Sequence, residues 1–308
     1  MTTSHRPPTL LVFADDWGRH PSSCQHLIRH LLDCHEVYWV NTIGMRAPRL
    51  DRATLARGLE KVRHWTNRAS NNEQILLQTN LHIITPLMWP WFRSGFDRRI
   101  NRALLLGQLV PVLESMPAPP IAITTVPIVS DLVGRLPVER WVYYCVDDFG
   151  HWPGLDQTAL RRLEESLVRR VETLITVSET LQDKLARMGR ASHLLSHGVE
   201  LDHWSASGRG PKAPLPELVG LPRPLVVFWG MLDRRIDVQF LARLASDLTE
   251  GTIVLVGPES DPDPALAAIP RLVRLPPFSY ERLPDLAREA SVLIMPYADL
   301  AVTRAMQP

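Results

Sequence analysis

The segment from Trp141 to Trp204 constrains the fold most, because short apolar runs alternate in it with amphipathic stretches. The apolar runs are Trp141–Val146, Thr173–Val177 and His193–Ser196. The first run is rich in β-branched and aromatic residues and is typical of a strand buried on both faces. The second predicts another short buried strand, and the third predicts a further strand. Between the first two runs, leucine or valine recurs at positions 160, 163, 167 and 171, which is the spacing of one helix face. The alternation of strand and helix predicts a parallel, doubly wound α/β sheet.

Polar residues gather just past the ends of two of these predicted strands. Asp147 and Asp148 follow the first strand, and His197 with Gly198 follows the third. An open parallel sheet binds its ligands beyond the carboxyl ends of its strands. We therefore expect a ligand at this edge, with capping of the next turn by either aspartate as the alternative.

The same alternation runs through the rest of the 308-residue chain. Before residue 141 it predicts a helix at Ser22–Leu32 and strands at Thr9–Ala14, Tyr38–Asn41, Ile75–Thr85 and Ile121–Thr125. The segment Ser205–Pro224 is rich in Pro and Gly and has no apolar period, as is typical of a domain boundary. After it we predict strands at Leu225–Trp229, Thr252–Val256, Arg271–Leu275 and Val292–Met295, and helices at Val238–Leu248 and Tyr280–Ala290. The expected domains are residues 1–205 and 225–308, joined by a linker at 206–224.

The central stretch contains YYCVDDF, a helix with Glu164, LITVSETL and SHGVELDHW. In this order and spacing, these segments resemble the end of the N-terminal domain in GT-B glycosyltransferases. The similar group is the large retaining one that includes teichuronic-acid and exopolysaccharide sugar transferases. The opening of the chain, with WGRHPSS and VYWVNTIGMR, is similar to the opening of these enzymes. The resemblance implies two Rossmann-like domains. It also implies transfer of a sugar from a nucleotide-diphosphate sugar to a glycan or lipid-linked acceptor in cell-surface polysaccharide biosynthesis.

The resemblance assigns roles to residues of the N-terminal domain. In these enzymes the first loop faces the acceptor, which implies acceptor-side roles for Asp16, Trp17, Gly18 and Arg19. Asp147 stands where many members place a histidine that contacts the donor sugar. His197 offers an imidazole near the expected interdomain cleft, so Asp147 and His197 are the predicted catalytic residues. Two alternatives stay open: His197 satisfied by its own loop, and an aspartate pair that binds metal as in GT-A transferases.

A second set of residues is expected to bind the donor. Gly230 directly follows a strand and opens the segment GMLDRRID, where a glycine lets backbone amides approach a phosphate. The segment looks like the start of the nucleotide-sugar domain, but Met231 replaces the arginine found there, so Arg234 or Arg235 is expected to bind the diphosphate. The resemblance further implies that Gly257 forms a turn under the nucleobase and that Leu275 makes a backbone contact. The alternative is a tight strand–helix turn with solvated arginines.

Composition and missing motifs exclude several other classes of protein. The net charge of +1 gives no argument for nucleic acid, and three cysteines without CxxC spacing argue against a disulfide framework or a zinc site. No GxGxxG follows the first strand, which argues against a dinucleotide oxidoreductase, and no GxSxG, HExxH or P-loop occurs. Four histidines lie near the first helix, at 20, 26, 30 and 35, but only His26 and His30 share a face. We expect a cytoplasmic protein without a tightly bound metal or cofactor, whose nucleotide sugar is a substrate.

Charge is uneven along the chain, which suggests a membrane surface as a partner. Residues Arg46–Arg102 hold eleven Arg or Lys and four Asp or Glu, a local charge of +7. Within this range Trp89, Trp91 and Phe92 are interleaved with arginines, as at a membrane interface. The prediction is peripheral attachment to the anionic inner face of the cell membrane. The alternative is an ordinary surface helix whose aromatic side chains pack inward.

Two other functions stay open, and so does the activity of this chain. The rival enzyme is a nucleotide-sugar epimerase of the same architecture, and the rival without activity is a divergent or truncated binding subunit. Only 88 residues run from Leu221 to Pro308. The segment Asp299–Pro308 looks like the loop that precedes, in the similar enzymes, a helix whose carboxylate holds the donor ribose. The expectation is therefore an incomplete C-terminal domain and a weak or inactive transferase.

Overall fold

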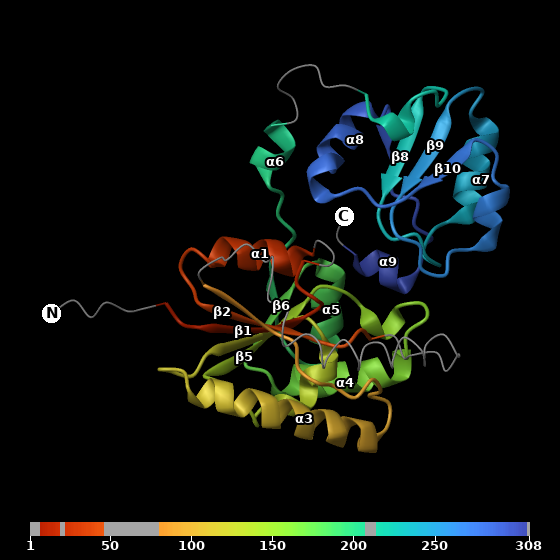
Figure 1. The fold of residues 1–308 in the computed structure, drawn as a ribbon. Coiled ribbons are helices and arrows are strands. Elements are labelled where there is room, and N and C mark those ends of the chain that lie inside the picture. Colours follow the sequence, from red (N-terminus) through yellow and green to blue (C-terminus); the bar gives the residue numbers. More distant parts are fainter. Residues whose placement is uncertain (1–6, 19–21, 46–79, 207–213, 307–308) are drawn as a thin grey trace. The chain divides into compact units, whose positions relative to one another are not determined.

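The computed structural model describes residues 7–18, 22–45, 80–206 and 214–306, which form two compact units (Figure 1). Unit 1 comprises residues 1–197 and 305–308, and unit 2 comprises residues 198–304. The division falls between His197 and Gly198, ahead of the linker that the sequence suggests. Helix α6 (Leu201–Ala206) therefore belongs to unit 2, where its His203 ring stacks on Tyr280 with a centroid distance of 4.1 Å.

Unit 1 is built on a seven-stranded sheet in the order β3-β2-β1-β4-β5-β6-β7, with every pair parallel. Its strands are β1 (Leu10–Ala14), β2 (Val37–Asn41), β3 (Leu81–Ile84), β4 (Ile121–Thr124), β5 (Arg140–Cys145), β6 (Thr173–Thr176) and β7 (His193–Leu194). The chain builds outward from β1 to β3 and then returns to build from β4 to β7. The strand order therefore reverses between β1 and β4, and such a switch point opens a crevice at the carboxyl ends of the strands.

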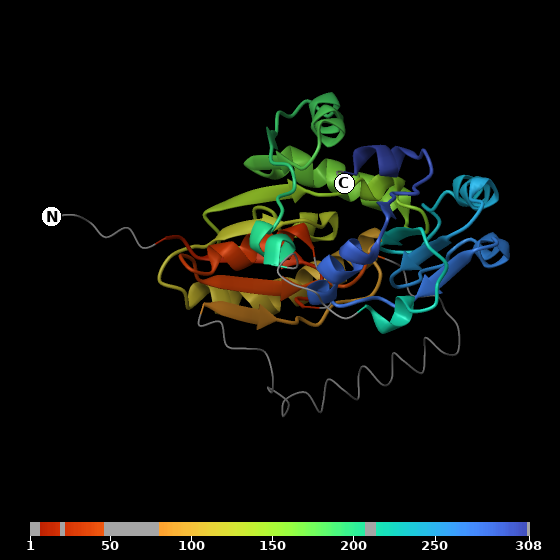
Figure 2. The ribbon, with the colours of Figure 1, turned by 90° about the horizontal axis from the view of Figure 1, so that it is seen from above.

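The helices of unit 1 begin at side chains that accept hydrogen bonds from the first turn. They are α1 (Ser23–Leu31), α3 (Gly95–Glu114), α4 (Gln157–Arg170) and α5 (Glu179–Arg187), with the 3-10 turns η2 (Pro127–Leu132) and η3 (Phe149–His151). Ser22, Asp156 and Ser178 cap α1, α4 and α5, and Ser94 forms a capping box with Asp97 at α3. Helices α1 and α3 lie on opposite faces of the sheet (Figures 1 and 2), so the central strands are buried on both sides.

The core of unit 1 confirms that the central apolar runs form buried strands, whereas the edge strand β7 is exposed. All five residues of β1 are buried, and Phe13 stacks on Trp141 of β5 with a centroid distance of 5.5 Å. Trp39, Trp141 and Tyr143 are among the largest fully buried side chains. Burial of such rings contributes several kcal/mol each, of the order of 25 cal/mol per Å².

Unit 2 holds a four-stranded parallel sheet in the order β10-β9-β8-β11. Its strands are β8 (Leu225–Trp229), β9 (Thr252–Val256), β10 (Leu272–Leu275) and β11 (Val292–Leu293). Its other helices and turns are η4 (Pro216–Leu218), α7 (Val238–Asp247), η5 (Pro264–Ala268), η6 (Tyr280–Arg282) and α8 (Leu283–Glu289). Alternate residues of β8 divide between two cores: Val226 and Phe228 lie in the cluster with Leu241 of α7, and Leu225 and Val227 in the cluster with Leu286 of α8. Helices α7 and α8 therefore cover opposite faces.

The structure confirms an α/β protein with two Rossmann-like parallel sheets, the second one smaller, and it changes several element boundaries. The edge strands β7 and β11 are two residues long instead of four, because their pairing with β6 and β8 covers only two residues of each. The helix expected at Tyr280–Ala290 is divided into η6 and α8, with Pro284 in the first turn of α8, where proline fits. Helix α9 (Ala301–Ala305) forms within the segment expected to be a loop. Of the strand expected at Ile75–Thr85, residues before 80 lie outside the described part of the chain.

Candidate functional site

The loop after β1 is held by side chains from two neighbouring elements. The backbone N–H of Trp17 donates to Asn41 Oδ1 at the end of β2 (3.0 Å), and that of Gly18 donates to Gln25 Oε1 on α1 (3.0 Å). The Trp17 ring packs edge-on against Trp39 with a centroid distance of 4.7 Å. These contacts place Asp16, Trp17 and Gly18 together at the carboxyl end of the sheet, beside the switch point. Arg19, the fourth residue assigned to this loop, lies outside the described residues.

The exit of β5 is anchored by a buried network of charged side chains. Lys184 Nζ on α5 lies 2.8 Å from Asp148 Oδ1 and 2.5 Å from Glu164 Oε2 on α4. The Tyr143 hydroxyl of β5 donates to the other oxygen of Glu164 (2.9 Å), and His151 Nδ1 lies 2.8 Å from Asp148 Oδ2. The network therefore joins β5, α4, α5 and η3, and one of its members, Asp148, directly follows Asp147.

The network holds its ionised groups in the charged state. Burial alone would raise the pKa of Asp148, but attraction by Lys184 and hydrogen bonds from Lys184 and His151 outweigh it, so this pKa is lowered. Burial alone would lower the pKa of Lys184, but its attraction to Glu164 and Asp148 and its hydrogen bond to Asp148 outweigh burial and raise this pKa. At neutral pH the site therefore holds the ammonium of Lys184 against the carboxylate of Asp148.

His197 follows β7, and its side chain differs from those of the network. Among the described residues its Nδ1 atom has no hydrogen-bond partner. Burial lowers the pKa of His197, so the imidazole is neutral at pH 7. Strand β6 separates β5 from β7 in the sheet, so Asp147 and His197 lie on the same edge with one strand between them.

In unit 2 the structure brings together three residues assigned to donor binding. The N–H of Gly230 donates to the carbonyl of Val256 (2.9 Å), and the N–H of Gly257 donates to the carbonyl of Leu275 (3.1 Å). The φ angles of Gly230 and Gly257 are +153° and +154°, which side chains rarely adopt. The residues at the carboxyl ends of β8, β9 and β10 are thus hydrogen-bonded to one another along one edge of the sheet. Both glycine N–H groups are used within the chain, so the glycines shape this edge through their backbone geometry.

The two arginines of this region have different surroundings. Arg235 is buried, its Nε lies 2.9 Å from Asp233 Oδ1, and its guanidinium lies 5.3 Å from the centre of the Tyr297 ring. The side chain of Arg234 is 48% exposed, and its Nε lies 3.4 Å from Asp261, which is also exposed. An exposed pair of this kind is weak. A diphosphate in solution can therefore reach the guanidinium of Arg234, whereas that of Arg235 holds the loop together.

Sequence reasoning missed two groups of residues. Lys184 follows Leu181 by three positions and precedes Leu185, both of which are buried, and a lysine between core leucines was the available signal. In unit 2, His203 and Trp204 of α6 pack on Tyr280 and Trp229, with the two tryptophan rings 6.0 Å apart. Trp229 is the last residue of β8, so α6 contacts the same edge as Gly230.

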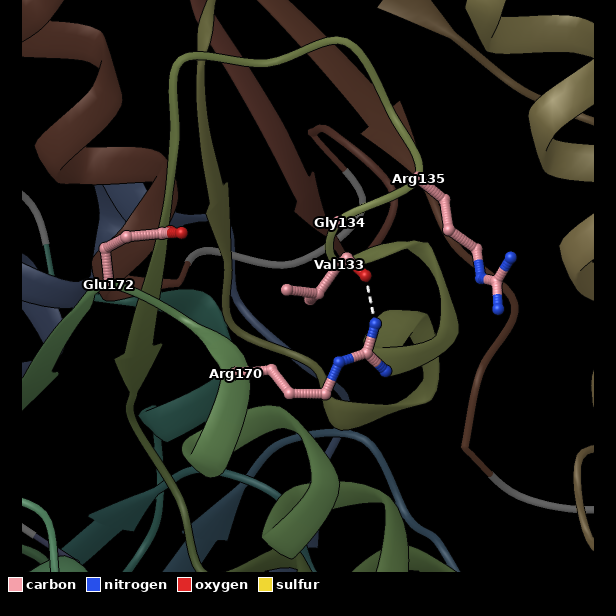
Figure 3. A pocket seen from close by; sticks show the side chains of 5 residues that line it. All are labelled: Val133, Gly134, Arg135, Arg170 and Glu172. Carbon is pink, nitrogen blue, oxygen red and sulfur yellow. Dashed lines mark hydrogen bonds between the residues drawn. The ribbon is translucent and has the colours of Figure 1, made fainter.

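A hollow of about 410 Å³ lies at the other end of the unit 1 sheet (Figure 3). It is lined by Val133, Gly134, Arg135, Arg170 and Glu172. Glu172 directly precedes β6, so the hollow is at the amino ends of the strands, away from the predicted site. The Arg170 guanidinium donates to the Val133 carbonyl and is thus engaged in packing α4 against the turn that follows η2.

Comparison with known proteins supports the fold. No protein-family model matches the sequence, and no curated protein matches it. The chain is similar to the structure of Anabaena Alr3699/HepE in complex with UDP and glucose, with a TM-score of 0.59 and 14% identity over 93% of this chain and 73% of that one. It is also similar to sucrose-phosphate synthase from Thermosynechococcus elongatus, with a TM-score of 0.60 and 13% identity over 95% and 77% of the two chains. A trehalose-6-phosphate structure from E. coli, bound with UDP-2-fluoro glucose, has a TM-score of 0.57 and 13% identity over 94% and 78%. These similarities establish the fold, that of GT-B proteins with two Rossmann-like units.

Proposed function

We propose that the protein is a glycosyltransferase that moves a sugar from a nucleotide-diphosphate sugar to a glycan or lipid-linked acceptor. The observation that carries this proposal is the edge of unit 2, where the exits of β8, β9 and β10 join beside the exposed Arg234. The fold is shared with Alr3699/HepE in complex with UDP-glucose, which has a TM-score of 0.57 to this chain. An edge of glycine turns with a cation beside it suits a nucleoside diphosphate.

Each unit has a distinct role in this proposal. Unit 2 binds the donor through Gly230, Gly257 and Leu275, with Arg234 as the cation that meets the diphosphate. Unit 1 supplies Asp147 and His197 to the reacting sugars, and Asp16, Trp17, Gly18 and Arg19 to the acceptor. Catalysis rests on positioning and on stabilisation of the departing diphosphate by cations and amides. The chemistry needs no tightly bound metal or cofactor.

The proposal places the enzyme in cell-surface polysaccharide biosynthesis, on the cytoplasmic face of the membrane. Its support is a set of side chains on α3 and in the segment before it, which we call the α3 set: Leu87, Phe96 and Arg99 are exposed, and Arg102 is half-buried. Leu87 is 44% exposed and Phe96 is 68% exposed. Arg93 and Arg98, in the same region, form ion pairs with Asp156 and Asp131, although the Arg93 side chain is 68% exposed. Phe92 of the predicted aromatic cluster packs into the core of unit 1. None of the described helices has both the length and the apolar character needed to cross a bilayer.

The test is direct binding and turnover of a nucleotide sugar by the full chain. Calorimetry with UDP and UDP-glucose measures donor binding, and release of UDP measures turnover. Arg234→Gln should weaken UDP binding about tenfold or more, since a hydrogen bond to a charged group contributes roughly 1.5–3 kcal/mol. Arg243→Gln is the matched control, because Arg243 is exposed on α7 and pairs with Asp247.

The possible outcomes distinguish three candidate functions: a transferase, an epimerase and a binding subunit. Release of UDP that depends on Asp147, tested with Asp147→Asn, supports transfer. Conversion of the sugar while it stays attached to UDP would replace transfer by epimerisation. Binding without any turnover would leave a binding subunit, and failure to bind any nucleoside diphosphate would overturn the proposal.

A further inference from the structure

We infer that Lys184 is a positioning residue for the loop after β5, residues 147–151, and so for the side chain of Asp147. The inference rests on the proposed function only in giving Asp147 a catalytic role. The positioning itself is a property of unit 1 and is measurable without any substrate.

Lys184 supplies the charged link between the loop and α4, beside a weaker contact in which the Cys145 thiol lies 3.8 Å from both Glu164 Oε1 and the Asp147 carbonyl oxygen. Its ammonium reaches Asp148 from the loop and Glu164 from α4, at 2.8 Å and 2.5 Å, and its side chain is 12% exposed. Glu164 is 1% exposed and also accepts the Tyr143 hydroxyl, so β5 and α4 fix it from both sides. The position of Glu164 is thus fixed, and the Lys184 ammonium binds both Glu164 and Asp148 of the loop.

The charge of the network explains what the lysine does. Without its ammonium, two carboxylates would face one another in a buried site, and one of them would have to move into water or take up a proton. Glu164 lies inside a helix of fourteen residues and cannot move without disturbing it. Asp148 lies in a loop and can move. Loss of Lys184 should therefore release the loop while α4 stays in place.

Asp147 would move with its neighbour. Successive Cα atoms are only about 3.8 Å apart, so a shift of Asp148 is passed to Asp147 directly. The loop is also packed closely on α4, since a Cβ on Gly150 would come within 2.5 Å of Arg161 Cγ. Buried ion pairs contribute little net stability compared with apolar packing. The two ion pairs of Lys184 lie at the carboxyl end of β5, where a parallel sheet binds its ligand. This position indicates that the network fixes the geometry of the loop.

The experiment compares Lys184→Met, Lys184→Arg and the matched control Arg187→Met, which changes an exposed cation on the same helix. Hydrogen exchange should show protection of residues 146–151 falling about tenfold or more in Lys184→Met, as expected for loss of two charge-assisted bonds. Protection should return in Lys184→Arg and stay unchanged in Arg187→Met. If Lys184→Met does not fold, Lys184→Gln, which removes the charge but keeps a donor, replaces it.

Turnover of UDP-glucose supplies the second readout. Lys184→Met should lower kcat with little change in KM for the donor, and it should have no further effect in an Asp147→Asn background. Unchanged exchange at 146–151, or loss of protection spread evenly over unit 1, would overturn the inference. An enzyme without turnover but with the expected local exchange would contradict the proposed function and leave the positioning role standing.

Discussion

The carbonyl oxygen of Gly230 lies so close to the Cα of Gly257 that a Cβ on Gly257 would come within 1.8 Å of it. The exits of β8 and β9 therefore touch backbone to backbone, with no room for any side chain. The N–H of Gly230 reinforces the contact by donating to the carbonyl of Val256, directly before Gly257. The predicted donor edge thus depends on two glycines at once.

Replacing Gly257 should damage unit 2 more than replacing a glycine that has space. Gly257→Ala combines a backbone clash with a φ of +154°, and should lower the free energy of unfolding by about 3 kcal/mol or more. Gly220→Ala is the control, because Gly220 has a φ of +81° but nothing within 4 Å of its Cβ position. It should cost only about 1–2 kcal/mol. Urea unfolding followed by tryptophan fluorescence measures the unfolding free energy of both variants. Equal destabilisation by the two substitutions would contradict the predicted clash.

The sequence predicts the central strands well because their ends are marked by turn residues. Leu225–Trp229 stops at Gly230 and Thr252–Val256 stops at Gly257, and both strands have these bounds in the structure. Edge strands are less predictable, because their length depends on pairing with a neighbour. Leu195 and Ile294 each make one further backbone hydrogen bond to a neighbouring strand, after which the ladder ends.

The site is predictable where it follows directly from strand ends, and not where it depends on distant partners. Gly230, Gly257 and Leu275 meet because their strands are adjacent and parallel. Lys184 finds its partners 20 and 36 residues away, and no spacing along the chain reveals such contacts. The difference between Arg234 and Arg235 is likewise invisible in the sequence, since it depends on which side chain turns inward to Asp233.

Those two neighbouring arginines should behave in opposite ways when replaced. Arg235→Gln leaves Asp233 buried without its cation, and should lower the free energy of unfolding of unit 2 by roughly 3–5 kcal/mol. Arg234→Gln removes only an exposed pair and should change it by no more than about 0.5 kcal/mol. Chemical unfolding of both variants checks this, and comparable destabilisation by Arg234→Gln would refute the assignment.

The charged network of unit 1 should make stability depend on pH in a defined direction. The pKa of Asp148 is lower in the folded protein than its ordinary value, since Lys184 and His151 outweigh the effect of burial. A lowered carboxyl pKa contributes stability that is complete above the unfolded pKa, about 3.9, and is lost as the pH falls through the folded pKa. The difference in unfolding free energy between the wild type and Asp148→Asn should therefore be constant at neutral pH and shrink below about pH 4. Urea titrations at several pH values measure it, and a difference that does not change with pH would exclude this role for Asp148.

The α3 set of side chains, Leu87, Phe96, Arg99 and Arg102, should bind vesicles that contain anionic lipid. Each basic residue near such a surface contributes about 1 kcal/mol, and an exposed phenylalanine adds apolar contact. The triple variant Phe96→Ser/Arg99→Gln/Arg102→Gln should therefore lower binding by more than about tenfold in cosedimentation. The matched control is Arg162→Gln/Arg169→Gln, which removes two exposed cations of α4. Binding by the wild type should also weaken as salt is raised, because salt screens exposed charges. Full binding by the triple variant, or equal binding of the wild type to neutral vesicles, would show that the α3 set is not the membrane contact.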